Sequence, residues 1–296
     1  MSNFQIFVDS TSDMFTELRK EYDVDYVSMN IVLKGEEKKA SLDWDIYSPK
    51  EFYDWMREGI KITTTLVPLE VFIDKWTKVL ESGKDVLYIS CSGALSGSVN
   101  VGRNARDMLL EKYPDRKIEI IDPLNSCKGQ ALMAMRASDL RKEGKSLEEV
   151  VEIIEKEKLC YNQFCTVATL DYLKRAGRIK AGKAFFGNIF GVKPIIISDA
   201  KGNNYAWKKA KGRRQSLLDL VNYTKENIVD PENQIVFVVH ADCIEDAEFL
   251  KEHIINEINP KEVRIDYLGP IIGSTTGPGT VAIFFYGKEV TIVGEE

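Results

Sequence analysis

The sequence predicts an α/β protein of two lobes, the first built on a mostly parallel sheet flanked by helices. Short apolar runs alternate with amphipathic stretches along the chain, which is the pattern of β-strands joined by helices. The chain has 296 residues, more than one average domain. Because 44% of these residues are hydrophobic, a chain of this length can bury a sizeable core in each of two lobes.

The expected elements follow this alternation in order. Strands are predicted at residues 4–8, 27–33, 86–89, 118–121, 194–197, 235–239, 263–268 and 281–285. Helical spacing is found at residues 51–56, 69–80, 130–141, 147–156, 217–226 and 247–255, with a further helical pattern from Val99. Because helices separate successive strands, the first half is expected to form a mostly parallel sheet.

The boundary between the lobes is expected just after a capped helix. Ser146 precedes Glu149 by three residues, the spacing of a capping box, so it predicts the start of the helix that ends in the charged run before Cys160. We therefore expect an N-terminal lobe and a C-terminal α/β lobe over residues 1–160 and 161–296, with the segment near residues 60–80 a candidate for exchange with the second lobe.

Composition excludes several classes of function. Lys and Arg number 40 against 46 Asp and Glu, a net charge of −6, which argues against general affinity for nucleic acid or anionic membranes. No apolar stretch approaches the roughly 20 residues of a membrane span, so stable membrane insertion is not expected. Basic clusters at residues 174–183 and 208–214 lack the interleaved aromatic side chains typical of nucleic-acid binding, and an acidic protein partner is the alternative for them.

Cysteine usage is typical of a cytoplasmic protein without a metal site. The five cysteines are odd in number and include no CxxC pair, and the N-terminus lacks a signal-peptide pattern. Cys160 and Cys165 lack the histidine or carboxylate neighbours of a zinc site. The only histidines are His240, expected to be structural, and His253, expected to be solvated.

Two segments rich in hydroxyl groups are the candidates for ligand binding. We expect Thr63-Thr64-Thr65 and Ser92–Ser98 to form turns at helix entrances, where the amides carry partial positive charge and favour a carboxylate or phosphate. A simple helix-capping role for the threonines is the alternative. Ser96 lacks the Gly-x-Ser-x-Gly elbow of a hydrolase nucleophile, and two histidines offer few bases, so binding is favoured over hydrolysis.

Two further segments are open to a structural or a functional interpretation. Residues 9–13, Asp-Ser-Thr-Ser-Asp, follow the first strand, so they are expected to cap a helix starting near Met14 and to line a cleft at the carboxyl end of the sheet. The aromatic and aliphatic run over residues 184–190 fits either the wall of an apolar tunnel or the core.

Several motifs occur together in the order and spacing of the DegV family, which the chain resembles over nearly its whole length. They are Val8-Asp-Ser-Thr-Ser-Asp13, Thr63-Thr-Thr-Leu-Val-Pro68, Ala94-Leu-Ser-Gly-Ser98, Leu173-Lys-Arg-Ala-Gly-Arg-Ile179, Lys193-Pro194, and Gly269-Pro270 with Gly277-Pro-Gly279. The resemblance implies a two-lobed, non-catalytic protein that binds a long-chain fatty acid such as palmitate between its lobes. In some members a fatty-acid kinase receives the bound acid and performs the phosphoryl transfer.

The resemblance also implies roles for particular residues. The fatty-acid carboxylate is expected to contact the hydroxyls of Thr63 or Thr64 and of Ser96, with Arg178 in support. A solvated position is the alternative for Arg178. Members that work with a kinase commonly carry histidine at the position of Thr275, so threonine there weakens the case for kinase delivery while leaving lipid binding intact. No cofactor other than the bound fatty acid is implied.

Overall fold

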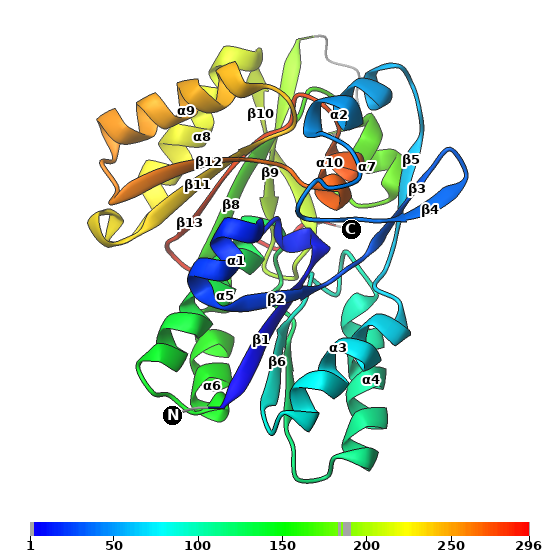
Figure 1. The fold of residues 1–296 in the computed structure, drawn as a ribbon. Helices are drawn as coiled ribbons and strands as arrows, with labels where there is room; N and C mark the ends of the chain where they lie inside the picture. The colour runs from blue at the N-terminus through cyan, green and yellow to red at the C-terminus, as the bar shows by residue number, and fades with distance from the viewer. Residues whose placement is uncertain (1–2, 183–184, 186–190, 296) are drawn as a thin grey trace.

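The computed structural model describes residues 3–182, 185 and 191–295, whose strands form a four-stranded, a six-stranded and a three-stranded sheet (Figure 1). The predicted α/β class is confirmed. Each predicted helix is present, and Ser146 and Glu149 form the expected capping box at the start of α6 (Leu147–Glu157). Of the helices in the described part of the chain, none is both long and apolar enough to cross a membrane.

The first sheet is parallel throughout. Its strands stand in the order β2 (Val24–Val27), β1 (Phe4–Asp9), β6 (Asp85–Ile89) and β7 (Ile118–Ile121). Near-continuous apolar runs suit these strands because helices cover both faces. In Figure 1, α3 (Leu69–Glu81) and α4 (Ser98–Lys112) lie on one side of the sheet, and α5 (Lys128–Lys142) and α6 lie on the other.

The three-stranded sheet was not expected. The stretch over 27–33, predicted as one strand, is two: β2 ends at Val27 and β3 (Asn30–Leu33) joins the antiparallel order β4 (Glu36–Lys39), β3, β5 (Ile62–Thr65). The chain leaves the first sheet because the amide of Met29 donates to Ser10 Oγ, at 3.0 Å, instead of continuing a ladder. Helix α2 (Pro49–Arg57) connects β4 with β5.

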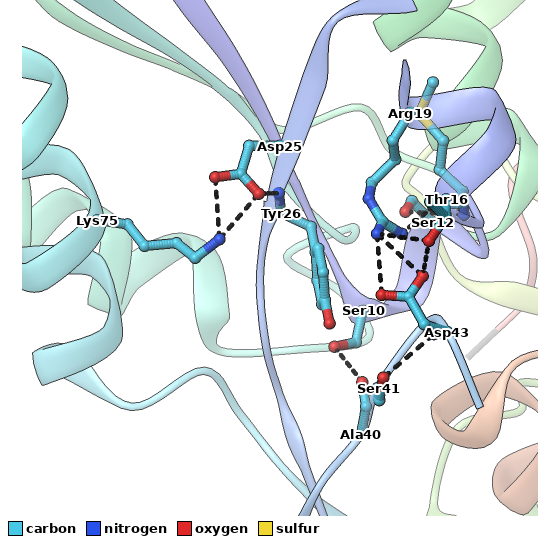
Figure 2. A network of polar contacts seen from close by, with 11 residues as sticks. Ser10, Ser12, Thr16, Arg19, Asp25, Tyr26, Ala40, Ser41, Asp43 and Lys75 are labelled. Atoms are coloured by element: carbon cyan, nitrogen blue, oxygen red, sulfur yellow. Dashed lines mark hydrogen bonds and ion pairs between the residues drawn. The ribbon is translucent and has the colours of Figure 1, made fainter. Parts of the chain in front are cut away.

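A polar network fastens this small sheet to the first strand–helix unit (Figure 2). Ser10 lies in the 3-10 helix over Ser10–Ser12, and its hydroxyl donates to the carbonyl of Ala40 at 2.9 Å. The same oxygen accepts from the amide of Met29. These two bonds hold both ends of the β3–β4 hairpin at Ser10. Beyond the hairpin, Asp43 pairs with Arg19 of α1 (Thr16–Tyr22) at 3.0 Å. The hairpin, and with it β5, therefore has a fixed position relative to the first sheet.

The second lobe contains the six-stranded sheet. Its order is β10 (Asn204–Lys211), β9 (Val192–Ser198), β8 (Tyr161–Thr166), β13 (Val281–Tyr286), β11 (Ile235–His240) and β12 (Glu262–Tyr267). Only the β11–β12 pair is parallel among these described strands. Helices α8 (Arg213–Asn227) and α9 (Ile244–Glu257) cover one face, as Figure 1 shows.

The other face of this sheet turns toward the first lobe. Side chains alternate between faces along a strand. Phe164 and Ile283 accordingly belong to the core under α8 and α9, whereas Cys165, Ala282 and Phe284 belong to the core shared with the first sheet. Helix α5 lies between the sheets and contacts β1 and β6 as well as β8 and β13.

We keep the lobe limits 1–160 and 161–296 as a proposal. The four-stranded sheet lies within residues 4–121 and the six-stranded sheet within residues 161–286, which supports a boundary near residue 160. Within the segment near 60–80, β5 packs against α10 (Pro270–Thr276) of the second lobe, whereas α3 packs against β6 of the first. We keep the exchange as a proposal, and these contacts support it for β5.

Candidate functional site

A cavity of about 550 Å³ lies where the three sheets meet. It falls within the range of roughly 300–1,000 Å³ that small-molecule sites occupy. Its wall combines β5, the turn after β6, the start of α5, the inner face of the six-stranded sheet, α7 (Asp171–Ala176) and α10. Residues from both lobes therefore enclose it, and each residue that we singled out for the head group lines it: Thr63, Thr64, Ser96, Arg178 and Thr275.

Much of the cavity wall is apolar. The inner face of the six-stranded sheet contributes Ile196, Ala282 and Phe284, all almost completely buried. Helix α10 and the loop before it add Leu268 and Ile271. These side chains bring hydrocarbon surface to the cavity, so an apolar ligand segment would be stabilised by removal from water.

The Ser96 hydroxyl stands at the end of a short hydrogen-bond relay. The amide of Ser98 donates to Ser96 Oγ at 3.2 Å, and the two hydroxyls lie 3.0 Å apart. Ser98 Oγ also accepts from the amide of Val67 at 3.2 Å. A hydroxyl has one proton and two lone pairs. When Ser98 donates to Ser96, both lone pairs of Ser96 are occupied and its proton is left to point into the cavity.

The threonines occupy a strand, so our expectation of a turn at a helix entrance was wrong. Three β-branched residues favour extended backbone, and α3 begins only after Pro68. Their hydroxyls therefore cap no helix. The Ser92–Ser98 segment does lead directly into α4, as predicted, although no side chain caps that helix.

Strand alternation distinguishes Thr63 from Thr64. Thr64 stands opposite Ile31 in β3, whose side chain is fully buried, and shares the face of Ile62. Thr63 shares the other face with Thr65, whose hydroxyl donates to Glu37 of β4 at 2.8 Å. Thr64 thus lies on the face of the buried Ile31 and Ile62, and we propose it as the threonine nearer the head group, although Thr63 and Thr64 are both exposed and both line the cavity. Among the described residues, the hydroxyls of Thr63 and Thr64 have no hydrogen-bond partner.

Arg178 is exposed, but it is not simply solvated. It follows α7 and the left-handed Gly177, and its Nε donates to the carbonyl of Leu95, the residue before Ser96. Its Nη1 donates to the carbonyl of Ala176 at 3.0 Å. These bonds hold the guanidinium beside the Ser96 turn, where its charge can act on an anion at the cavity mouth.

Thr275 lines the cavity from α10 with its proton already engaged. Its Oγ1 donates to the carbonyl of Ile271 at 2.9 Å, one helical turn earlier. Only its lone pairs remain, and these repel a carboxylate. We therefore propose Thr275 as a wall residue of the head-group region and not as a donor to the head group.

Residues 9–13, after β1, mainly form hydrogen bonds within the fold, and few of them reach the cavity. The Asp9 carboxylate is fully buried and accepts from the amide of Thr11, the hydroxyl of Tyr88 and the amide of Cys91. The helix expected near Met14 begins instead at Thr16, because left-handed backbone at Asp13 interrupts the turn. Thr11 is the member of this segment that lines the cavity.

The histidines take no part in the cavity wall. His240 is buried; its Nδ1 accepts from the amide of Cys243 at 3.2 Å, and burial lowers its pKa. His253 is bonded to the carbonyl of Phe249 within α9. The run over 184–190, for which the sequence leaves a tunnel wall or the core open, lies outside the described residues except for Phe185. No group of His, Cys, Asp and Glu within the described ranges could hold a metal ion.

Sequence reasoning missed several polar residues of the cavity wall, among them Asn204, Ser274 and Thr280. Two more are important below. Gln163 of β8 and Ser126, just before α5, are buried and line the wall. For Gln163, the available signal was the glutamine itself, within the six residues of β8 (Tyr161–Thr166). A buried strand rarely carries a glutamine, so this residue pointed to a special role.

Comparison with known proteins identifies the family. A family model described as an uncharacterised protein, DegV family, matches residues 3–288. The chain belongs to the DegV family. A DegV domain-containing protein of Clostridium perfringens is 39% identical over 289 residues, which cover 97% of this chain and 98% of the relative. The predicted family resemblance is thereby confirmed.

Solved DegV structures share the fold. A structure described as fatty acid binding of a DegV family protein from Thermus thermophilus has a TM-score of 0.85 at 28% identity and covers 97% of this chain and 100% of its own. A DegV lipid binding protein from Thermotoga maritima has a TM-score of 0.85 at 24% identity, with coverage of 98% and 100%. This DegV chain therefore has the two-lobed fold that its sequence predicts.

Proposed function

We propose that this DegV protein binds a long-chain fatty acid, such as palmitate, in the cavity between its lobes. The observation that carries the proposal is a single cavity with an apolar wall at Ile196, Ala282 and Phe284 and with hydroxyls available to donate at Thr64 and Ser96. An amphiphile with an anionic end matches both features. The Thermus thermophilus relative, described by its fatty acid binding, supports this ligand class.

In this proposal the carboxylate lies between strand β5 and the Ser96 turn. An ionised carboxylate is expensive to remove from water unless donors replace its hydration. Thr64 and Ser96 each offer one hydroxyl proton, and hydrogen bonds to an ionised group are stronger than those between neutral groups. Arg178 adds a positive charge fixed to the carbonyl of Leu95.

The tail supplies most of the binding free energy. Burial of about a dozen methylenes at about 0.8 kcal/mol each stabilises the complex by about 10 kcal/mol before the costs of association are subtracted. That magnitude is compatible with an acid that stays bound during purification.

A binding protein is favoured over an enzyme. The described residues of the cavity wall include no histidine, aspartate or glutamate that would act as a base on a bound ester. The three cysteines of the wall are poor nucleophiles, because burial raises the pKa of each thiol, that of Cys165 to about 12.

Delivery of the bound acid to an ATP-dependent fatty-acid kinase is the alternative role. The exposed cations Lys61, Arg175 and Arg178 border the cavity and suit an acidic partner surface. Thr275, with its proton bonded to Ile271, argues mildly against it. Formation of an acyl phosphate when the loaded protein is mixed with such a kinase and ATP supports the delivery role, and its absence excludes that kinase as the partner.

The direct test is extraction of the purified protein with organic solvent after denaturation, followed by mass spectrometry. We expect a near-stoichiometric fatty acid. Ser96→Ala and Thr64→Val should each reduce affinity for palmitate about tenfold, the effect of one hydrogen bond to a charged group. Thr63→Val tests the other threonine of the same strand, and we expect a smaller loss of affinity from it than from Thr64→Val. An empty extract together with no binding of added palmitate or oleate overturns the proposal.

A further inference from the structure

The cavity has a second polar region, apart from the hydroxyls assigned to the head group. Gln163 lies on β8 and is only 7% exposed, while the next residue, Phe164, belongs to the opposite core. The Gln163 side chain is therefore on the inner face and lines the cavity. Its Nε2 lies 3.5 Å from Asn204 Oδ1, at the limit of a hydrogen bond. Its Oε1 has no partner in the part of the chain that the structure describes.

Ser126 is a second polar side chain of the same kind. It is 5% exposed, lines the cavity, and its hydroxyl has no hydrogen-bond partner within the described ranges. The neighbouring Asn125 donates from Nδ2 to the carbonyl of Tyr161 at 2.7 Å. This bond fastens the segment that carries Ser126 to β8, the strand that carries Gln163, so both polar groups belong to one region of the wall.

A plain hydrocarbon chain is a poor ligand for this region. It would remove water from the amide and the hydroxyl without replacing the lost hydrogen bonds. On the sheet, Gln163 is paired with Phe284 of β13, and the next position on this face, Cys165, is flanked by the apolar Ala282 and Ile196. Gln163, with Asn204 beside it, and Ser126 thus add polar groups next to an apolar part of the wall. A ligand group that bonds to Gln163 and Ser126 gains affinity.

The available atoms identify the chemistry of that ligand group. The Gln163 Oε1 needs a donor, which an ionised carboxylate lacks, so the region does not suit the head group. A keto oxygen accepts only. A hydroxyl both donates and accepts, and so it can bond to the Oε1 of Gln163 and accept from Ser126.

We propose that this cavity selects a long-chain acid whose acyl chain carries a hydroxyl, bound by Gln163 and Ser126. The inference rests on the proposed function and deepens it, because it names the class of fatty acid that the same cavity prefers. A site built to bond a ligand hydroxyl discriminates against the analogue without it, since its polar groups are then left unpaired.

The test compares stearate with stearates hydroxylated near the carboxylate, at mid-chain and near the methyl end. Each displaces a fluorescent fatty acid from the delipidated full-length protein. We expect one hydroxylated isomer to bind at least about tenfold more tightly than stearate, the effect of one hydrogen bond made instead of lost. Gln163→Leu should abolish this preference and leave stearate affinity equal or higher. Ser126→Ala should reduce the preference, and it decides the matter if the leucine variant does not fold.

Other outcomes overturn the inference in recognisable ways. Equal binding of stearate and all hydroxylated isomers by the unaltered protein means that water satisfies Gln163. An equal loss for both ligands in Gln163→Leu assigns that residue to the head group or to the fold. Thr64→Val is the control: it should weaken all the acids alike and preserve their order. If no acid binds to the unaltered protein, the proposed function fails together with the preference.

Discussion

The amide of Val67 donates a hydrogen bond of 3.2 Å to the hydroxyl of Ser98, which lies 3.0 Å from the hydroxyl of Ser96. Val67 comes two residues after β5, and Ser98 is the first residue of α4. A single buried hydroxyl thereby links the strand that carries Thr64 to the turn that carries Ser96. The distance between the two proposed head-group donors, Thr64 and Ser96, therefore depends on this link.

Replacement of Ser98 by Ala should weaken fatty-acid binding even though Ser98 is not among the described residues of the cavity wall. The change leaves the buried amide of Val67 without its acceptor, which costs about 1–3 kcal/mol. It also frees the Ser96 hydroxyl to rotate. Thermal unfolding and palmitate affinity should both decrease. Ser82→Ala, at the exposed end of α3, is the control, because the Ser82 hydroxyl donates to the carbonyl of Val79 in its own helix. Unchanged palmitate affinity in Ser98→Ala would refute the link.

An ion pair between a buried lysine and a half-buried aspartate joins the lobes, and its two partners should respond differently to mutation. Lys128 is fully buried, and its Nζ lies 2.6 Å from the carboxylate of Asp266. Asp266→Ala leaves a buried charge without its partner and should lower the free energy of unfolding by about 3–5 kcal/mol. Lys128→Met should cost less, because the Asp266 carboxylate that it leaves unpaired is 31% exposed and keeps its contact with water. Urea denaturation of both variants is the measurement, and equal losses would contradict this account.

Asp13 should make the stability of the protein depend on pH. Its carboxylate is fully buried, and this desolvation raises its pKa from 3.8 to about 7, although it accepts from the thiol of Cys127 at 3.1 Å. Between these two values the folded state binds more protons than the unfolded state, so the free energy of unfolding decreases as pH rises. The decrease is on the order of 4 kcal/mol, complete near pH 7.

Asp13→Asn removes the proton that titrates and should remove this part of the pH dependence. Denaturant titrations from about pH 4 to about pH 8 measure it. The variant should keep its stability where the unaltered protein loses it. The same slope in both proteins would mean that other groups cause the dependence.

The sequence predicts the first sheet well, because local patterns determine it. Three of its strands, β1, β6 and β7, are largely apolar and were predicted, whereas β2, with the sequence Val-Asp-Tyr-Val, was predicted only at Val27. The capping box at Ser146 depends only on neighbouring residues. The small sheet was not predicted, since its position depends on a bond between Ser10 and Ala40, 30 residues apart. Three threonines in a row fit a capped turn as well as a strand, and only the pairing with β3 decides between them.

The candidate site was predicted only in part, because local patterns can be recognised in the sequence and contacts between distant residues cannot. Thr64, Ser96 and Arg178 were found through the family resemblance and surround one cavity. Strand β8 was not predicted because Asn162 and Gln163 interrupt its apolar pattern. Gln163 was therefore not predicted as a cavity residue. The face of β5 on which Thr64 lies, and the contact of Arg178 with Leu95, depend on residues distant in the sequence.

Gly277, the residue that follows α10, should tolerate substitution poorly. It ends the helix at φ +87°, and a Cβ there would lie 2.3 Å from the ring of Tyr172, which lines the cavity. Gly277→Ala therefore combines backbone strain with a clash that pushes Tyr172 out of place. Gly144→Ala is the matched control, because Gly144 has φ +90° and no neighbour within 4 Å.

The two alanine variants separate backbone strain from crowding. Gly144→Ala should cost about 1 kcal/mol from the left-handed backbone alone, and Gly277→Ala about 2 kcal/mol more from the displaced ring. Only Gly277→Ala should also change palmitate affinity, because Tyr172 belongs to the cavity wall. Thermal unfolding and ligand titration measure the two effects. An equal loss of stability in both variants, with affinity unchanged, would show that the ring moves aside freely.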